Sequence, residues 1–235
     1  ALALVSTSHV INPFVFKAMP YDPIKDVTPI TVIGKSMMVL VVNPAVPAQN
    51  LAEFVRLLKA SPGKLNYGSS GNGGVTHLPA EMFHREAGVS ARHIPYKGLS
   101  AQVTDIIAGV VEYGFVPVGV AVPQLKAGKL RALAVTGAVR SPMLSQVPTN
   151  KEGGLASYVC EPWLAIIGPA GLTATQTQSL YGDVRTTLEQ KEMRTLMDAQ
   201  DMTPVTMTPE ETATYFRSET AAYGALANYA GLRAE

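Results

Sequence analysis

Residues 66–77 read NYGSSGNGGVTH, in which a short β-type segment runs into a glycine-rich turn and then into a helical pattern. Glycine allows positive φ angles in such a turn, and the start of the following helix exposes unpaired backbone N–H groups at the positive end of the helix dipole. The side chains of Ser69, Ser70, Asn72 and Thr76 supply further donors. The segment therefore suits an anion, and the alternative is an ordinary capped strand-to-helix turn.

The sequence around this segment alternates β-type runs with helical patterns, which is typical of βα units around mainly parallel sheets. Strands are predicted at 37–42, 65–68, 91–95, 111–116, 130–136 and 158–167. A helix begins at Asn50, which forms a capping pair with Glu53, and others are predicted at 73–87, 99–108 and 118–127. After residue 172 the pattern is helical, at 173–190, at 192–200 and from Thr208 onward, where Thr-Pro-Glu-Glu forms a capping box.

This order of elements predicts a discontinuous two-lobed α/β protein. The βα units fill residues 44–157, which form the second lobe, while residues 1–43 and 158–235 form the first lobe. Residues 36–43 and 158–166 are expected to cross between the lobes, which places a hinge at these strands and a ligand cleft between the lobes.

Composition excludes several classes of protein. The formal net charge is +1 and the basic residues are scattered, so no basic surface for nucleic acid is expected. The longest apolar run, 37–42, is far shorter than the roughly 20 residues that cross a bilayer. Cys160 is the only cysteine, which excludes an intrachain disulfide and a cysteine-rich metal site. The first residues lack the basic region of a signal peptide, as those of a processed protein would.

Motif spacing argues against catalysis and cofactor binding by the glycine-rich segment. The segment lacks the final glycine of both a nucleophile elbow and a dinucleotide fingerprint, and no phosphate-binding GK[ST] motif occurs. His77 and His84 are about 10.5 Å apart along one helix, too far to bind one metal ion together. We therefore expect no cofactor and no metal, with capping or surface positions for His84 and His93 and possible ligand contacts for His9 and His77.

Several segments together resemble one family. LNYGSSGNG at 65–73, HIPYKG at 93–98, LRALAVT at 130–136 and QVPT at 146–149 are similar, in order and spacing, to the Bug (TctC-like) substrate-binding proteins of tripartite tricarboxylate transporters. SHVINP at 8–13, PYDP at 20–23 and GPAG at 168–171 agree. The resemblance implies a type II periplasmic binding protein, a two-lobed Venus flytrap that captures a small carboxylate in the periplasm and delivers it to membrane permease subunits. It implies no enzymatic activity.

The resemblance also implies which residues hold the ligand. Family members use backbone amides, small hydroxyl side chains and bridging waters from both lobes. The corresponding residues here are Thr7, Ser8 and His9 in the first lobe, and Ser69, Ser70, Asn72, Thr76, His77, Tyr96 and Lys97 in the second. Many relatives carry an aspartate where this chain has Val116-Pro117, so an acidic partner for a ligand ammonium is absent. The expected ligand is an organic acid other than an amino acid.

The family pattern begins with about two βα units, roughly 60 to 70 residues, that have no counterpart before Leu4. A first lobe without them is expected to have an uncovered sheet edge and exposed apolar surface, so that it either associates with another chain or fails to close. Two other functions stay open: the ligand-sensing domain of a transcription regulator, which needs an attached helix-turn-helix or a dimerising flank, and a serine hydrolase that uses Ser70 and His77.

Overall fold

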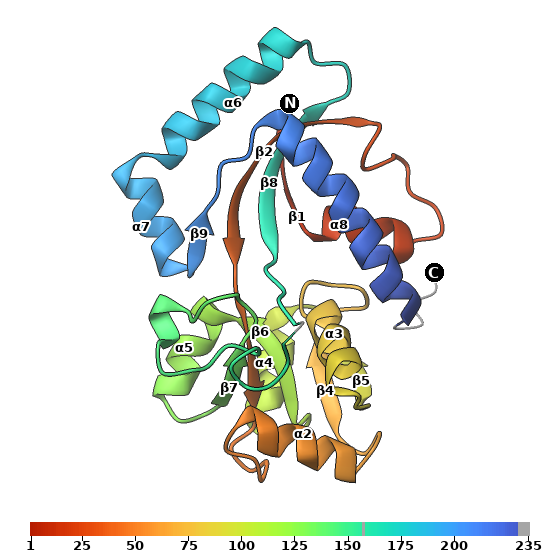
Figure 1. The fold of residues 1–235 in the computed structure, drawn as a ribbon, viewed down its shortest axis with the longest axis vertical. Helices are drawn as coiled ribbons and strands as arrows, with labels where there is room; N and C mark the ends of the chain where they lie inside the picture. The colour runs from red at the N-terminus through yellow and green to blue at the C-terminus, as the bar shows by residue number, and fades with distance from the viewer. Residues whose placement is uncertain (157, 230–235) are drawn as a thin grey trace. The chain divides into compact units, whose positions relative to one another are not determined.

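The computed structural model describes residues 1–156 and 158–229, which fold into two compact units. Unit 1 comprises Ala1–Lys35 with Pro162–Glu235, and unit 2 comprises Ser36–Glu161. Each unit is an α/β structure built on one sheet, four-stranded in unit 1 and five-stranded in unit 2 (Figure 1). Within the described part of the chain, the helices lack the combination of length and apolar character that crossing a membrane requires.

The sheet of unit 1 has the strand order β1-β8-β2-β9. These strands are β1 (Ala3–Ser6), β8 (Trp163–Pro169), β2 (Val27–Ser36) and β9 (Met202–Pro204). Both β1 and β2 pair with β8 in antiparallel register, and the β2 register shifts near Pro29 and Gly34. Of these strands only β8 was predicted, because β1 and β9 are short and β2 contains a proline and a glycine, which normally interrupt strands.

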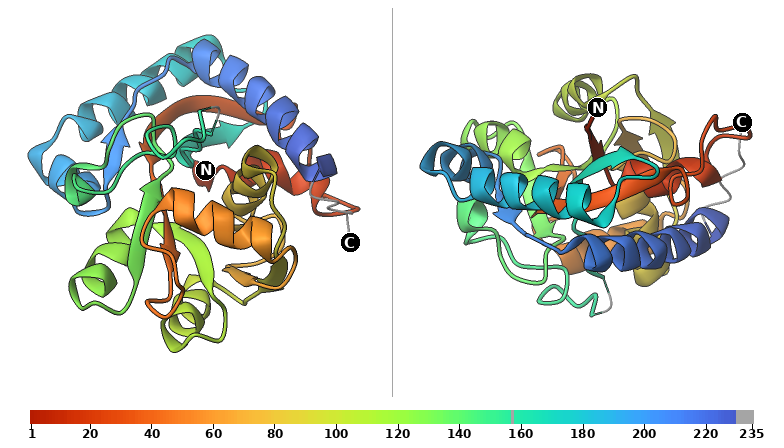
Figure 2. Two further views of the ribbon diagram at one scale, coloured as in Figure 1. Left: turned by 60° about the horizontal axis from the view of Figure 1, so that its bottom comes forward. Right: turned by 90° about the horizontal axis from the view of Figure 1, so that it is seen from above.

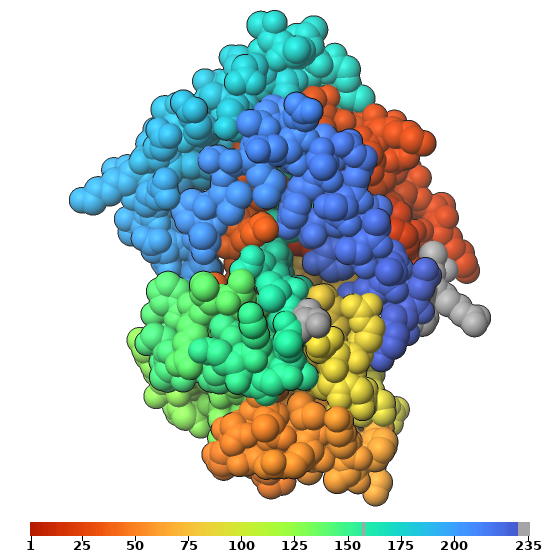
Figure 3. Space-filling view, in the orientation of Figure 1, coloured from red at the N-terminus to blue at the C-terminus, as the bar shows by residue number. Residues whose placement is uncertain are grey.

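The helices of unit 1 are α1 (Ser8–Ile11), the 3₁₀ turn η1 (Asn12–Phe14), α6 (Ala174–Leu188), α7 (Lys191–Ala199) and α8 (Pro209–Tyr229). The predicted capping box of α8 is confirmed: the Glu211 N–H donates to Thr208 Oγ1 at 3.2 Å, and the Thr208 N–H donates to the Glu211 carboxylate at 2.8 Å. The long α8 packs against α1 (Figure 2). Side chains of α6, α7 and α8 cover most of unit 1 in the space-filling view (Figure 3).

The sheet of unit 2 has the strand order β5-β4-β6-β3-β7. Its strands are β3 (Met38–Val42), β4 (Asn66–Ser69), β5 (Arg92–Pro95), β6 (Tyr113–Pro117) and β7 (Arg131–Val135). The β4 strand runs parallel to β5 and β6, as the βα pattern predicts, whereas β3 runs antiparallel to both β6 and β7.

The prediction of mainly parallel sheets is therefore wrong for β3 and for unit 1. A βα connection suggests a direction only for the strands that it joins, and β3 pairs with β6 and β7, neither of which adjoins it along the chain. Because β3 lies inside the five-stranded sheet, residues 36–43, which the sequence assigns to the first lobe, belong to unit 2. The strand predicted from residue 158 begins only at Trp163, since the Cys160 N–H donates to the carbonyl of Thr136 in a loop.

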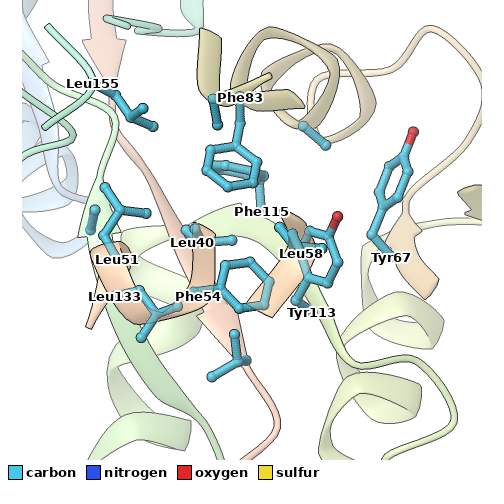
Figure 4. Packing of buried hydrophobic residues seen from close by; sticks show 14 of the residues in the cluster. Leu40, Leu51, Phe54, Leu58, Tyr67, Phe83, Tyr113, Phe115, Leu133 and Leu155 are labelled. Carbon is cyan, nitrogen blue, oxygen red and sulfur yellow. The ribbon is translucent and has the colours of Figure 1, made fainter. Parts of the chain in front are cut away.

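The helices of unit 2 are α2 (Leu51–Ala60), α3 (His77–Ala87), α4 (Leu99–Ala108), α5 (Val118–Lys126) and the 3₁₀ turn η2 (Pro142–Leu144). The helix predicted from residue 73 begins at His77 instead, because Gly71 and Gly73 take φ angles of 141° and 66° that interrupt a helix. The core beneath α2 is aromatic: the Phe54 ring meets the Tyr113 ring edge-on with centroids 4.9 Å apart (Figure 4).

Replacement of Asn50 tests the local signal that starts α2. The Asn50 carboxamide oxygen accepts the Glu53 N–H at 2.9 Å, and the Glu53 carboxylate accepts the Gln49 N–H at 2.7 Å. Asn50→Ala is expected to lower the free energy of unfolding by about 1 kcal/mol, while Asn50→Ser keeps a capping oxygen and most of the stability. Urea unfolding of the two variants checks this, and equal losses would contradict it.

Candidate functional site

The glycine-rich loop, residues 69–76, joins β4 to α3 and supplies acceptors for many of its own amides. The Ser70 N–H donates to Thr76 Oγ1 at 2.7 Å, and the Gly71 N–H donates to Ser69 Oγ at 3.2 Å. The Gly73 N–H donates to His77 Nδ1 at 2.9 Å. The loop is therefore held in one conformation by its own hydroxyl groups and by the first residue of α3.

Three amides of this segment stay free. Among the described residues, no acceptor lies in hydrogen-bonding geometry with the N–H groups of Asn72, Val75 and Thr76. The sequence led us to expect unpaired amides at the start of the helix, and the structure has free amides at these three positions just before His77. Free amides close to a helix N-terminus attract negative charge. This part of the loop can bind an anion.

Hydroxyl groups lie beside these amides. Thr76 is buried and its Oγ1 lies 2.9 Å from Ser70 Oγ, so the two hydroxyls form a bonded pair. Ser70 is half-buried and Asn72 is exposed, so both reach the surface of the loop. Ser69 is fully buried, and its hydroxyl donates to the Gly71 carbonyl inside the loop. Of the predicted serines, only Ser70 combines partial exposure with a position next to the free amides.

The end of β5 meets the glycine-rich loop. The Tyr96 N–H donates to the Ser69 carbonyl at 2.9 Å, which fixes Tyr96 beside the loop. Burial of the Tyr96 hydroxyl and the nearby Asp105 carboxylate raise the pKa of Tyr96 to about 12, so the hydroxyl stays protonated beside that carboxylate at neutral pH. Lys97 follows on the surface and is exposed. The structure thus brings the predicted second-lobe residues together in unit 2.

Behind the loop lies a histidine cluster, which we define by its members Tyr67, His77, Glu81, His84, His93 and Tyr113. The rings of His77 and His93 stack with centroids 3.9 Å apart and an angle of 5° between their planes. His93 Nε2 lies 2.6 Å from Ser69 Oγ, and His84 Nε2 lies 2.6 Å from the Tyr113 hydroxyl. The prediction of capping or surface positions for His84 and His93 is therefore wrong, because both side chains belong to this interior network.

Glu81 is the only carboxylate of the cluster. It accepts a hydrogen bond from the Tyr67 hydroxyl and lies 3.2 Å from His84 Nδ1. Burial alone would raise the pKa of Glu81, but its bond to His84 and the charge of that residue outweigh burial and lower it, so the carboxylate is ionised at neutral pH. Burial and the Glu81 charge raise the pKa of Tyr67, which stays protonated.

Both stacked histidines are neutral at neutral pH. Burial, reinforced by the neighbouring His93, lowers the pKa of His77 to about 4. Burial also lowers the pKa of His93 to about 4, and this outweighs the opposing effect of Glu81. A neutral imidazole has one ring nitrogen that accepts and one that donates. His77 accepts through Nδ1 from Gly73, which leaves its proton on Nε2.

The first-lobe candidates lie in unit 1 and have partners there. Thr7 is 2% exposed, and its hydroxyl accepts the Trp163 N–H at 2.9 Å. His9 is buried, and its Nε2 donates to the Pro23 carbonyl at 2.8 Å. Ser8 begins α1 and is half-buried. Thr7 and His9 are thus engaged in holding the local structure of unit 1.

The loop does not show the arrangement of a serine hydrolase. Ser70 bonds to Thr76 and His77 bonds to Gly73, so these two residues do not form a nucleophile and its base. Ser69 and His93 do form a serine–histidine pair, but Ser69 is 0% exposed and its hydroxyl donates to Gly71. In the described part of the chain, no group of three or more His, Cys, Asp or Glu side chains is arranged to hold a metal ion.

One pattern in the sequence indicates part of the histidine cluster, which we did not predict. His77, Glu81 and His84 follow the spacing i, i+4, i+7, which places all three on one face of a helix. A carboxylate between two histidines on one face indicates a network, whereas the distance between the histidines alone suggested unrelated side chains. The pairing of His93 with this face depends on the sheet order and has no local signal.

Comparison with known proteins agrees with the fold and extends over nearly the whole chain. Protein BugT of Bordetella pertussis is 31% identical over 86% of this chain and 62% of its own length. The R. palustris protein Rpa4515, solved with adipate, is 28% identical with a TM-score of 0.89, covering 100% of this chain and 79% of that one. A structure described as a periplasmic transporter is 32% identical with a TM-score of 0.88, covering 99% and 78%.

The chain spans less than two thirds of the length of the curated relatives that it matches, 62% and 64% for two of them. The family model for the tripartite tricarboxylate transporter family receptor, TctC, matches residues 1–232. The α/β units, the glycine-rich loop and these similarities lead to one conclusion: the chain belongs to the TctC family of tripartite tricarboxylate transporter receptors.

Proposed function

We propose that this chain is an extracytoplasmic solute-binding protein that captures a small carboxylate in the periplasm for the permease of a tripartite tricarboxylate transporter. The observation that carries the proposal is the set of free amides at Asn72, Val75 and Thr76 beside the Ser70 hydroxyl. Such a set binds a carboxylate without a charged clamp. The adipate in the structure of the R. palustris relative supports the same class of ligand.

The charges around the loop favour an acid with a neutral or apolar body. Residues 69–77 contain no acidic side chain, and the strand end at Val116-Pro117 offers none either. A ligand ammonium would therefore lack a partner in this part of unit 2, whereas Lys97 adds a positive charge after Tyr96. Amino acids should bind far more weakly than dicarboxylates of similar length.

The proposed contacts fall into two groups. Ser70, Asn72 and Thr76 offer donors and Lys97 offers a positive charge, whereas Ser69, His77 and Tyr96 act mainly by holding the loop. From unit 1 we propose that Thr7, Ser8 and His9 contribute chiefly through backbone groups and bridging waters, because the side chains of Thr7 and His9 already have partners. No catalytic role is proposed for any of them.

Ser70→Ala tests the site directly. The variant removes a hydroxyl beside the free amides, while the backbone N–H of residue 70 still donates to Thr76 Oγ1. We therefore expect adipate to bind about three- to tenfold more weakly, with little change in stability. Isothermal titration calorimetry with adipate measures the affinity. Ser90→Ala is the matched control, since exposed Ser90 precedes β5 at the end of that strand opposite Tyr96.

Two results would oppose the proposal. Unchanged adipate affinity in Ser70→Ala would remove the loop from the site, and wild-type protein that binds neither adipate nor a longer or shorter dicarboxylate would remove carboxylate capture. Hydrolysis of a p-nitrophenyl ester that disappears in Ser70→Ala would instead support the hydrolase.

A further inference from the structure

The histidine cluster touches the glycine-rich loop at two points. His77 Nδ1 accepts the Gly73 N–H at 2.9 Å, and His93 Nε2 lies 2.6 Å from Ser69 Oγ. Since the Ser69 hydroxyl donates to the Gly71 carbonyl, Ser69 Oγ is the acceptor for a proton on His93 Nε2. Ser69 Oγ also accepts the Gly71 N–H at 3.2 Å. His77 therefore holds the Gly73 peptide directly, and His93 holds the Gly71 peptide through the Ser69 hydroxyl.

These two glycines flank the free amide of Asn72. Both have positive φ angles, which residues other than glycine rarely adopt. Glycine adopts positive and negative φ angles about equally readily, so its own conformational preference does not hold the loop in this shape. A change in the Gly71 or Gly73 peptide would turn the Asn72 N–H and the amides that follow. The direction of the free amides thus depends on the bond from Gly73 to His77 and on the bonds from Gly71 to Ser69, whose hydroxyl contacts His93.

We propose that His77 and His93 are positioning residues that, as a neutral stacked pair, lock Gly71 and Gly73 so that the free amides of the loop converge on one anion. This role rests on the carboxylate-binding function proposed above. The histidines touch the loop from its buried side and act on the ligand only through the backbone.

The stack is compatible only with the neutral rings. A proton on His77 Nδ1 would face the Gly73 N–H and break that bond, and two charged rings with centroids 3.9 Å apart would repel each other. Burial of the two rings is the main cause of their low pKa values, about 4 for each. The loop should therefore keep its geometry down to mildly acidic pH and lose it near pH 4.

Other ionisable groups face the pair from each neighbouring element. Tyr67 on β4 stacks on His93 with ring centroids 4.8 Å apart, and Tyr113 on β6 bonds to His84 of α3. Glu81 of α3 favours protonation of the pair, with its Oε1 3.9 Å from His77 Nε2. That carboxylate already accepts from Tyr67 and lies within bonding distance of His84, so it holds no direct bond to either stacked ring.

Matched substitutions separate positioning from general stability. His77→Asn places a carboxamide oxygen near the Nδ1 position and does not titrate, whereas His77→Ala removes the acceptor. His93→Gln and His93→Ala form the corresponding pair for Ser69. His84→Gln is the control, because His84 lies on the same face of α3 but bonds to Tyr113 and Glu81 instead of the loop.

The readouts are the ¹H–¹⁵N signals and hydrogen exchange of the Gly71 and Gly73 amides, together with adipate affinity at neutral pH. In wild type the Gly73 signal should titrate with a midpoint near pH 4, and in His77→Asn this titration should vanish. The alanine variants should exchange the affected glycine amide faster and bind adipate about tenfold more weakly, and the Asn and Gln variants should recover most of the affinity.

The outcomes are distinct. A Gly73 titration that persists in His77→Asn, or glycine amides that exchange at the wild-type rate in both alanine variants, overturns the positioning role. The same loss of amide protection in His84→Gln also overturns it, because the effect would then be general. If wild type binds no dicarboxylate, the proposed function fails, and the amide signals by themselves still decide whether the histidines position the loop.

Discussion

Acidification from pH 6.5 to about 4.5 is expected to lower the free energy of unfolding of unit 2 by about 2 to 3 kcal/mol through His77 alone. The His77 pKa falls from its ordinary 6.5 to about 4 in the folded protein. Between these values the unfolded chain binds a proton that the folded protein does not. The stabilising contribution is therefore complete above pH 6.5 and disappears as the pH falls toward 4.

Two other groups of the histidine cluster act in the same direction, and only Glu81 is separated from His77 by its pH range. His93 adds to the loss, though its ring is less enclosed and solvent screening reduces its contribution. The pKa of Glu81 lies below its ordinary value of 4.5, so protonation of this carboxylate destabilises unit 2 only at lower pH. The range from 6.5 to 4.5 therefore isolates the histidines.

Hydrogen exchange of unit 2 amides at several pH values measures this loss. Fluorescence is unsuitable because the only tryptophan, Trp163, belongs to unit 1, and the two units need not unfold together. His77→Asn should reduce the pH slope by up to about 1.4 kcal/mol per pH unit. A variant with the wild-type slope would show that His77 is already protonated in the folded protein.

The sequence predicted the elements whose signals are local. The Asn50 cap of α2 and the capping box of α8 lie within four residues of each helix start, and both are confirmed. The β2 strand was missed because Pro29 and Gly34 interrupt its pattern, and the structure accommodates both with register shifts. The antiparallel direction of β3 depends on its neighbours in the sheet, which no local pattern specifies.

The candidate site divides in the same way. Glycines, hydroxyls and a following helix in one short segment predicted an anion-binding loop, and the resemblance to relatives added Tyr96 and Lys97 to the same candidate site. The role of His93 depends on pairing between strands: it lies opposite Tyr67 in the β4–β5 ladder, which places the two rings side by side and directs His93 toward α3. Only the sheet order reveals that neighbourhood.

Phe54→Ala is expected to cost unit 2 about 4 kcal/mol, the largest loss we predict from a single substitution. Phe54 is 0% exposed, and its ring packs edge-on against Tyr113 and parallel to Phe83, with centroids 4.9 and 6.2 Å away. Figure 4 shows these rings gathered in the core, with Phe83 entering it from α3. Truncation leaves a cavity bounded by rigid aromatic rings, which cannot collapse to fill it.

Two further substitutions in α2 test whether the loss of stability comes from the core contacts of Phe54. Val55→Ala, next along α2 and only half-buried, should cost less than about 1 kcal/mol, and Phe54→Leu should recover part of the loss by filling some of the cavity. Hydrogen exchange should show the loss across the unit 2 sheet and no change in unit 1 if the units unfold separately. Since Tyr113 also bonds to His84, Phe54→Ala should loosen the histidine cluster as well. If Phe54→Ala instead lowers the free energy of unfolding by less than about 1 kcal/mol, α2 contributes little to the core.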